Sequence, residues 1–256
     1  MIVCPISVQA GITGFESPAA DYLQPQLSID DLLIGHPNAT FLGAASDDSM
    51  NGVGIFDGDV LICDRAVDAQ QGDVVLCNLN GESVYKIFDK ERRRLLSTNP
   101  VYQPVSIVDE DQFTVGGNVT SSLRLHRSNA FTWLESSEME YQHLQFSIHD
   151  LLVKHPNATF LGTACGHSMN GVGIFDGDVL ICDRAVEAQQ GDVIVCNLNG
   201  ELTCKLFDKN ARRLLSANPA YQPVEIAETD VFTIEGTLTC SIRLHRAGYS
   251  LKFEGL

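Results

Sequence analysis

The chain is short of positive charge. Its 256 residues include 33 Asp and Glu but only 17 Lys and Arg, which gives a formal net charge of −16. Acids are in excess both in residues 1–127 and in residues 128–256. Such a surface repels a phosphate backbone, so direct binding of nucleic acid is not expected. A short basic run at residues 92–94 is better explained as a charged strand edge that discourages edge-to-edge pairing.

Long apolar segments are also missing. No run of about 18 apolar residues occurs, so no membrane-spanning segment and no membrane partner are expected. The first residues lack the basic region and the long apolar region of a secretory signal. With 44% apolar and 20% charged residues, the composition is that of an ordinary globular protein. The sequence therefore predicts a cytoplasmic protein without a membrane anchor.

The eight cysteines form no C-x-x-C pair. Cys63 and Cys77 recur as Cys182 and Cys196, each inside an apolar run. A free thiol in such surroundings behaves as a small buried hydrophobe. We therefore expect reduced, buried cysteines rather than disulfides.

What the chain does contain is a second copy of itself. Residues 28–127 (the first copy) and residues 147–246 (the second copy) align without a gap at an offset of 119, with 71 of 100 positions identical. Each copy has the size of a small independent domain. Two such domains in one chain can form the contact that a homodimer forms between chains. The predicted organisation is an N-terminal arm at 1–27, a domain at 28–127, a linker with a degenerate arm at 128–146, and a second domain at 147–256.

Each copy is predicted to consist mainly of short strands. Ser28 should cap a single helical turn that stops at His36-Pro37. The dipeptide Asn80-Gly81 between two apolar runs predicts a β-hairpin. The expected strands of the first copy are 39–45, 59–63, 73–79, 82–88, 94–96 and 112–115. Short strands at this spacing predict a mainly β protein whose two domains fold back on themselves and pair as an intramolecular pseudo-dimer.

Two chemically useful residues recur at one spacing. Ser49 precedes Lys86 by 37 residues, and Ser168 precedes Lys205 by the same number. Each Lys lies among apolar residues on the far strand of the Asn-Gly hairpin, where loss of water favours its neutral form. A Ser within reach of a neutral Lys can act as a nucleophile without His or Asp. From these residues alone, a turn Ser and an edge-strand Lys without a catalytic role remain the simpler interpretation.

Further motifs stand in a fixed order around this pair. They are Ser17-Pro18-Ala19-Ala20-Asp21-Tyr22, His36-Pro37-Asn38-Ala39-Thr40-Phe41, Asp48-Ser49-Met50 and Asp57-Gly58-Asp59-Val60-Leu61. Together with Lys86 they resemble the UmuD branch of the LexA/UmuD family of self-cleaving serine peptidases. The resemblance covers nearly all of residues 11–127 and is repeated over 147–246. It implies an antiparallel β-domain that dimerises, a Ser/Lys dyad, an oxyanion held by backbone N–H groups, and no metal or cofactor.

The two copies depart from the family pattern in different ways. The family usually carries Gly two residues before the nucleophile, as Gly166 does, but the first copy has Asp47. A carboxylate at that place opposes the negative charge of the oxyanion, which makes Ser49 the weaker candidate. His167 beside Ser168 could suggest a Ser-His pair, but neighbours in sequence rarely face each other in the required geometry.

The resemblance also implies that the cleaved bond lies in the protein's own arm, before a Gly that follows Cys or Ala. Ala10-Gly11 fits that chemistry and is the favoured bond, whereas Thr13-Gly14 better fits the gapless spacing. The corresponding stretch ahead of the second copy, residues 131–135, contains no Gly. We therefore expect the dyad of the second copy to cleave the first arm across the pseudo-dimer, with the dyad of the first copy weakened.

Two functional classes follow. The resemblance implies an SOS-response autoprotease that is triggered by a RecA–single-stranded DNA filament. Its trimmed form would serve as the accessory subunit of an error-prone, UmuC-type Y-family DNA polymerase, with other UmuD-like chains as further partners. The alternative is a protease-inactive pseudo-dimer that binds the polymerase or acts as a decoy. A LexA-type repressor is disfavoured, because no helix-turn-helix domain is seen before the first copy and the charge is wrong.

Overall fold

The computed structural model describes residues 1–5, 28–127, 139–143 and 147–246, and of residues 2–5 it describes the backbone only. The two candidate cleavage sites, Ala10-Gly11 and Thr13-Gly14, lie outside the described residues. Most of the N-terminal arm and of the linker between the copies lies outside them as well.

The first copy contains α1 (Ile29–Leu33), β2 (Thr40–Ala44), the 3₁₀ turn η1 (Asn51–Val53), β3 (Val60–Asp64), β4 (Val74–Leu79), β5 (Glu82–Asp89), β6 (Arg94–Leu96), β7 (Val105–Ser106) and β8 (Phe113–Leu125). The second copy repeats them as α2 (Ile148–Leu152), β10 (Thr159–Cys165), η4 (Asn170–Val172), β11 (Val179–Asp183), β12 (Val193–Leu198), β13 (Glu201–Asp208), β14 (Arg213–Leu215), β15 (Val224–Glu225) and β16 (Phe232–Leu244). Outside these sets lie β1 (Ile2–Pro5), β9 (Met139–Glu140) and η3 (Tyr141–His143). No helix in the described ranges is long and apolar enough to cross a membrane.

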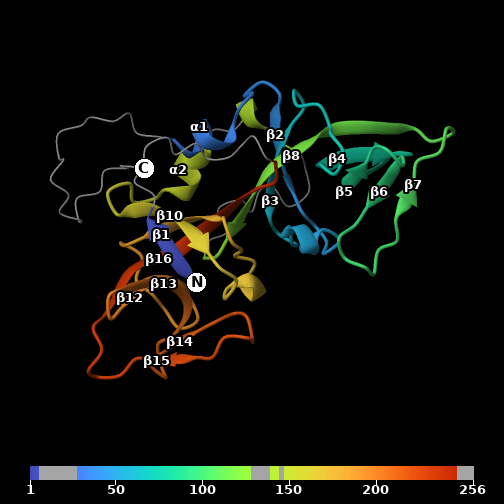
Figure 1. Ribbon diagram of the computed structural model, residues 1–256. Coiled ribbons are helices and arrows are strands. Elements are labelled where there is room, and N and C mark those ends of the chain that lie inside the picture. Colours follow the sequence, from blue (N-terminus) through green and yellow to red (C-terminus); the bar gives the residue numbers. More distant parts are fainter. Residues whose placement is uncertain (6–27, 128–138, 144–146, 247–256) are drawn as a thin grey trace.

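The described strands pair in antiparallel fashion and link both copies into one sheet system, which confirms the predicted fold class. In Figure 1 the first copy runs from blue to green, the second from yellow to red, and the long strands β8 and β16 meet between them. Their register places Leu123 opposite Ile242. These two residues are equivalent at the offset of 119, so a pseudo-two-fold axis passes through this pair.

Local sequence chemistry explains the repeated elements. The hydroxyl of Ser28 accepts a hydrogen bond from the N–H of Asp30 at 3.2 Å and caps α1, as predicted. Asn80 and Gly81 both have positive φ, at 54° and 92°, which is the backbone of a tight two-residue hairpin turn between β4 and β5. Six strands of the first copy lie where the apolar runs predicted them, and β8 extends ten residues past the predicted end at Val115.

The largest hydrophobic cluster joins the two copies. It combines buried residues of α1 and β8 with their equivalents in α2 and β16, among them Ile29, Leu123, Ile148 and Ile242. Each copy also has its own clusters around the inner strands. The cysteines whose side chains are described are not joined in disulfides and all but Cys165 are buried, in agreement with the prediction of reduced cysteine. Because apolar surface is buried between the copies, their association contributes directly to the stability of the chain.

Two arginines at the junction contact both copies at once. Arg124 of β8 donates to the carboxylate of Asp59 through Nε at 2.9 Å and a terminal nitrogen at 2.6 Å. It also donates to the carbonyl of Val172, in η4 of the second copy, at 3.4 Å. The same contacts recur in the reciprocal direction, made by Arg243, Asp178 and Val53. Each 3₁₀ turn is therefore contacted by an arginine from the opposite copy.

Gly54 and Gly173, which follow these turns, leave room for the arginines. Both have left-handed φ values, +80° and +75°. A Cβ at Gly54 would lie 1.3 Å from a guanidinium nitrogen of Arg243, and one at Gly173 would meet Arg124 in the same way. Glycine is required at these positions by conformation and by space.

Replacing Arg124 with Ala should strongly destabilise the protein, because it leaves Asp59 buried and without its ion-pair partner. The side chains of the pair are 17% and 4% exposed, and loss of one partner of a buried pair costs about 3–5 kcal/mol. Urea denaturation followed by circular dichroism would measure this loss. Arg93→Ala is the control, since its pair with Asp109 is 58% and 85% exposed and should leave the midpoint nearly unchanged. Equal midpoints for the two variants would contradict the assignment.

Two histidines at the same junction give the fold a pH dependence. Nε2 of His126 lies 2.9 Å from Oγ of Ser241, and Nε2 of His245 lies 2.8 Å from Oγ of Ser122. Burial, together with the neighbouring arginine on the same strand, lowers the pKa of His126 to about 4 and that of His245 to about 3. Both histidines are therefore neutral in the folded protein at neutral pH.

The unfolded chain binds more protons than the folded chain below the ordinary histidine pKa of about 6.5, so the free energy of unfolding should fall as the pH is lowered. We expect a loss of up to about 1.4 kcal/mol per histidine for each pH unit between pH 6 and pH 5. Urea titrations across this range would measure it. Replacing both His126 and His245 with Gln should remove most of the slope, and an unchanged slope would refute the effect.

Candidate active sites of the two copies

In the second copy, the end of β10 leads into the turn that carries Ser168. Gly166 has a φ of +97°, and its N–H donates to Oδ1 of Asp176 at 2.7 Å. This left-handed conformation is one that Gly adopts easily and other residues rarely adopt. It turns the chain so that Ser168, only 1% exposed, stands two residues before the start of η4.

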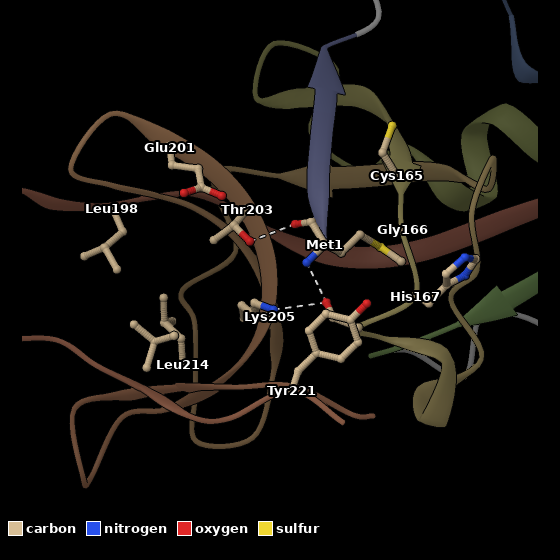
Figure 2. Close-up of a pocket in the computed structure, with 12 residues that line it drawn as sticks. Met1, Cys165, Gly166, His167, Leu198, Glu201, Thr203, Lys205, Leu214 and Tyr221 are labelled. Atoms are coloured by element: carbon tan, nitrogen blue, oxygen red, sulfur yellow. Dashed lines mark hydrogen bonds between the residues drawn. The ribbon is translucent and has the colours of Figure 1, made fainter. Parts of the chain in front are cut away.

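Strand β13 brings Lys205 to this hydroxyl. Its Nζ donates to Oγ of Ser168 at 3.0 Å and to Oγ of Ser216 at 3.0 Å. The aromatic ring of Tyr221 lies 5.7 Å from the same nitrogen, and Figure 2 shows Lys205 and Tyr221 near each other among the residues that line one pocket. The structure therefore brings together the Ser and the Lys that the sequence paired by spacing. In the described part of the chain no hydrogen bond joins the ring of His167 to Ser168.

The Ser168–Lys205 pair opens onto a cleft of about 430 Å³, within the size range of ligand sites. Met1 forms part of the wall of this open space, and strand β1, which starts at the next residue, runs antiparallel to β10 and beside β13. The α-amine of Met1 donates to Oγ of Ser168 at 2.5 Å, and its carbonyl accepts from the hydroxyl of Thr203 at 2.7 Å (Figure 2). Burial, with Lys205 as the next cause, lowers the pKa of this amine to about 6.

The first copy arranges its equivalent residues differently. Ser49 is 1% exposed, like its counterpart, but its own N–H donates to Oδ1 of Asp47 at 2.8 Å. No hydrogen bond between Ser49 and Lys86 occurs among the described residues; Nζ of Lys86 lies 5.3 Å from the ring of Tyr102 instead. Asp47 is not among the described residues with positive φ. The Asp therefore replaces the left-handed Gly with a carboxylate that binds the backbone N–H of the Ser.

This contact bears on any acyl-transfer chemistry in the first copy. N–H groups beside the nucleophile are the usual donors to an oxyanion, and they act only if they are free to point at it. At Ser49 that donor is already bonded to a negative group. In the second copy, Gly166 has no side chain that could reach the N–H of Ser168. A carboxylate at position 47 opposes the charge of an oxyanion, as the sequence predicts, and it also competes with the oxyanion for the N–H donor of Ser49.

Two groups of residues in the sites were missed from the sequence. Ser216 and its equivalent Ser97 each follow the Lys by 11 residues, so their recurrence at constant spacing was an available signal. Met1 and Thr203 carried no such signal, because β1 belongs to neither repeat and Thr203 is replaced by Val84 in the first copy. They become visible only when the chain is folded.

The protein is thus a duplicated antiparallel β-domain in which a buried Ser of the second copy contacts a partly buried Lys, and this pair is a site of the serine-peptidase type. The Peptidase S24-like family matches residues 3–120 and again residues 130–239, and the chain belongs to this family. By that membership it is of the serine-peptidase kind. The two matches also confirm that the family domain occurs as tandem copies.

Individual relatives agree with this assignment. The chain is 39% identical to protein ImpA of Salmonella typhimurium over 104 residues, which are 41% of this chain and 68% of ImpA. It is 34% identical to protein MucA of Escherichia coli over 125 residues, 48% of this chain and 85% of MucA. It is 37% identical to the LexA repressor of Ectopseudomonas mendocina over 92 residues, 35% of this chain and 45% of the repressor. The resemblance to the LexA/UmuD family is thus confirmed.

Proposed function

We propose that this protein is a self-cleaving serine peptidase in which Ser168 and Lys205 of the second copy remove the protein's own N-terminal arm. The observation that carries the proposal is the 3.0 Å hydrogen bond between Nζ of Lys205 and Oγ of Ser168, formed at a hydroxyl that is almost completely buried. A buried hydroxyl in contact with an amine is the arrangement that a nucleophile and its general base require.

In this mechanism the neutral amine of Lys205 takes the hydroxyl proton as Oγ of Ser168 attacks the carbonyl carbon of Ala10. Backbone N–H groups near Ser168 stabilise the oxyanion. The carbon–nitrogen bond to Gly11 then breaks, and Lys205 returns the proton to the departing amine. Water hydrolyses the resulting acyl-serine, with Lys205 acting again as base. The hydroxyl of Ser216, 3.0 Å from Nζ, orients the amine throughout.

The position of β1 supports the direction of this reaction. The first residues of the chain pair with β10 of the second copy, so the arm of the first copy reaches the cleft of the second. The amine of Met1 now lies beside Oγ of Ser168. For cleavage at Ala10-Gly11 the nitrogen of Gly11 must lie there instead, so residue 11 would have to take the place of residue 1. Cleavage therefore requires the arm to advance through the cleft by ten residues.

The wider role follows from the LexA/UmuD resemblance. We propose that a RecA–single-stranded DNA filament triggers cleavage in the cytoplasm, and that the trimmed pseudo-dimer then serves a UmuC-type translesion polymerase. The contact between Asp47 and the N–H of Ser49 favours a second candidate for the first copy alone. In that reading the first copy is an inactive partner that contributes structure and binding surface.

Separate Ser→Ala substitutions test which dyad acts. Ser168→Ala should abolish removal of the arm, whereas Ser49→Ala should leave most of it. Intact mass spectrometry, before and after incubation with RecA filaments or at alkaline pH, would follow the loss of residues 1–10. High pH favours the neutral form of a lysine amine and should promote cleavage without RecA. Loss of cleavage in Ser49→Ala but not in Ser168→Ala would reverse the assignment, and no fragment under either condition would favour the binding module.

The Gly at position 166 can be tested with a matched control. Gly166→Asp introduces the residue of the first copy, and we expect it to slow arm removal by about 100-fold or more, the effect of losing one oxyanion donor. Gly191→Asp is the control, because Gly191 also has a positive φ (+85°) and no atom within 4 Å of an added Cβ. Similar rates for the two variants would show that backbone strain, not the site, explains any effect.

A further inference from the structure

We propose that the gap between β10 and β13, at the wall of this cleft beside Ser168, is a binding site for a free peptide N-terminus, and that the chain's own segment Met1–Pro5 occupies it. The ligand class is an α-amino group on a residue with an apolar side chain, followed by an extended strand. Binding of this kind requires no bond to be cleaved, so it goes beyond the peptidase activity.

Each part of Met1 has a specific partner in the cleft. The α-amine donates to Oγ of Ser168 at 2.5 Å. The carbonyl accepts from the hydroxyl of Thr203 at 2.7 Å and from the N–H of Cys204 at 2.9 Å. The side chain is 7% exposed and belongs to a hydrophobic cluster that includes Met169 and Cys204. Amine, carbonyl and side chain are thus all bound, which distinguishes a built site from simple addition of a strand.

The backbone of residues 2–5, which follows Met1, is also bound, through strand pairing. Ile2 to Pro5 pair with Cys165 to Gly162 of β10, and Ile2 also pairs with Thr203 of β13. In Figure 1 the blue strand β1 lies among the yellow and orange strands of the second copy. The peptide therefore fills the gap between β10 and β13 and completes the sheet there.

The first copy provides an internal comparison, because two adjacent positions differ at this place. Thr203 and Cys204 are replaced by Val84 and Tyr85. Val84 has no hydroxyl to donate to a carbonyl. The larger Tyr85 extends across to β2, where its hydroxyl would lie 2.0 Å from a Cβ at Gly43. The small Cys204, whose thiol burial keeps protonated by raising its pKa to about 12, leaves space that the Met1 side chain fills.

The bound amine of Met1 lies next to the serine oxygen. After hydrolysis of a peptide bond at this site, the amine of the newly formed N-terminus would lie in the same position. The amine of Met1 is partly buried and shares this oxygen with the Nζ donor of Lys205, and both effects disfavour its charged form. The amine therefore binds in its neutral form, consistent with the lowered pKa of about 6 against 8.0 for a free terminus. Since the unbound amine holds more protons between pH 6 and pH 8, the segment should bind more tightly as the pH rises through this range.

Hydrogen exchange on the full-length protein tests the proposal. The amide at position 204 donates to the carbonyl of Met1, so it reports on occupancy of the cleft. The double variant Thr203→Val, Cys204→Tyr, which introduces the pair of the first copy, should lower the protection of this amide by at least about 10-fold. The reciprocal variant Val84→Thr, Tyr85→Cys is the control and should leave it unchanged. Unchanged protection in the first variant would overturn the proposal.

A chain extended by Gly-Ser before Met1 tests the need for a free amine. It should lose the same protection, whereas full protection would show that the strand binds without recognition of its terminus. If the double variant exchanges faster in β11, β12 and β16 as well, it has lost its fold, and Thr203→Val alone then decides. That variant keeps the side-chain shape and removes one hydrogen bond to Met1. Because exchange needs no catalysis, an inactive peptidase would leave these outcomes intact.

Discussion

The antiparallel pairing of β8 with β16, together with the arginine that each strand extends into the opposite copy, supports the rest of the structure. Arg124 neutralises Asp59 in its own copy and also holds the carbonyl of Val172 in the other. Val172 closes the 3₁₀ turn that begins two residues after Ser168. The turn that follows each serine is therefore held in part by a residue from the other copy.

On this shared scaffold, a few residues that face the cleft make the two sites different. Gly166 gives the turn before Ser168 a left-handed residue, whereas Asp47 bonds the N–H of Ser49. The small Cys204 leaves room for a peptide side chain, whereas Tyr85 fills the same region with its own ring. Both differences favour the second copy as the functional site, because its N–H donor and its peptide space are unobstructed, whereas side chains of the first copy take up both.

Much of this arrangement could be predicted from sequence because it depends on local chemistry, as in the Asn80-Gly81 hairpin and the spacing of Ser and Lys. Strand β8 shows the limit. Gly116 and Gly117 resemble a turn, but they lie where the register with β4 shifts at a bulge. Beyond them the strand is polar and still buried, because side chains such as Thr120 bond carbonyls of β3. The location of Met1 had no local signal at all, since it depends on a cleft built about 165 residues later.

The ion pairs and histidine contacts that join the copies use the same residues in both, while the apolar pair Leu123 and Ile242 and several residues that shape the clefts differ. The arginines, their Asp partners, the glycines after the 3₁₀ turns and the buried His–Ser pairs all recur at the offset of 119. A first copy that lost only its own chemistry could change any of its cleft residues, but it could not change these, because Arg124 positions the turn of Ser168. Conserved polar contacts at the junction, beside changes such as Asp47 for Gly166 in the clefts, are therefore what is expected if the first copy serves chiefly to hold the second in shape.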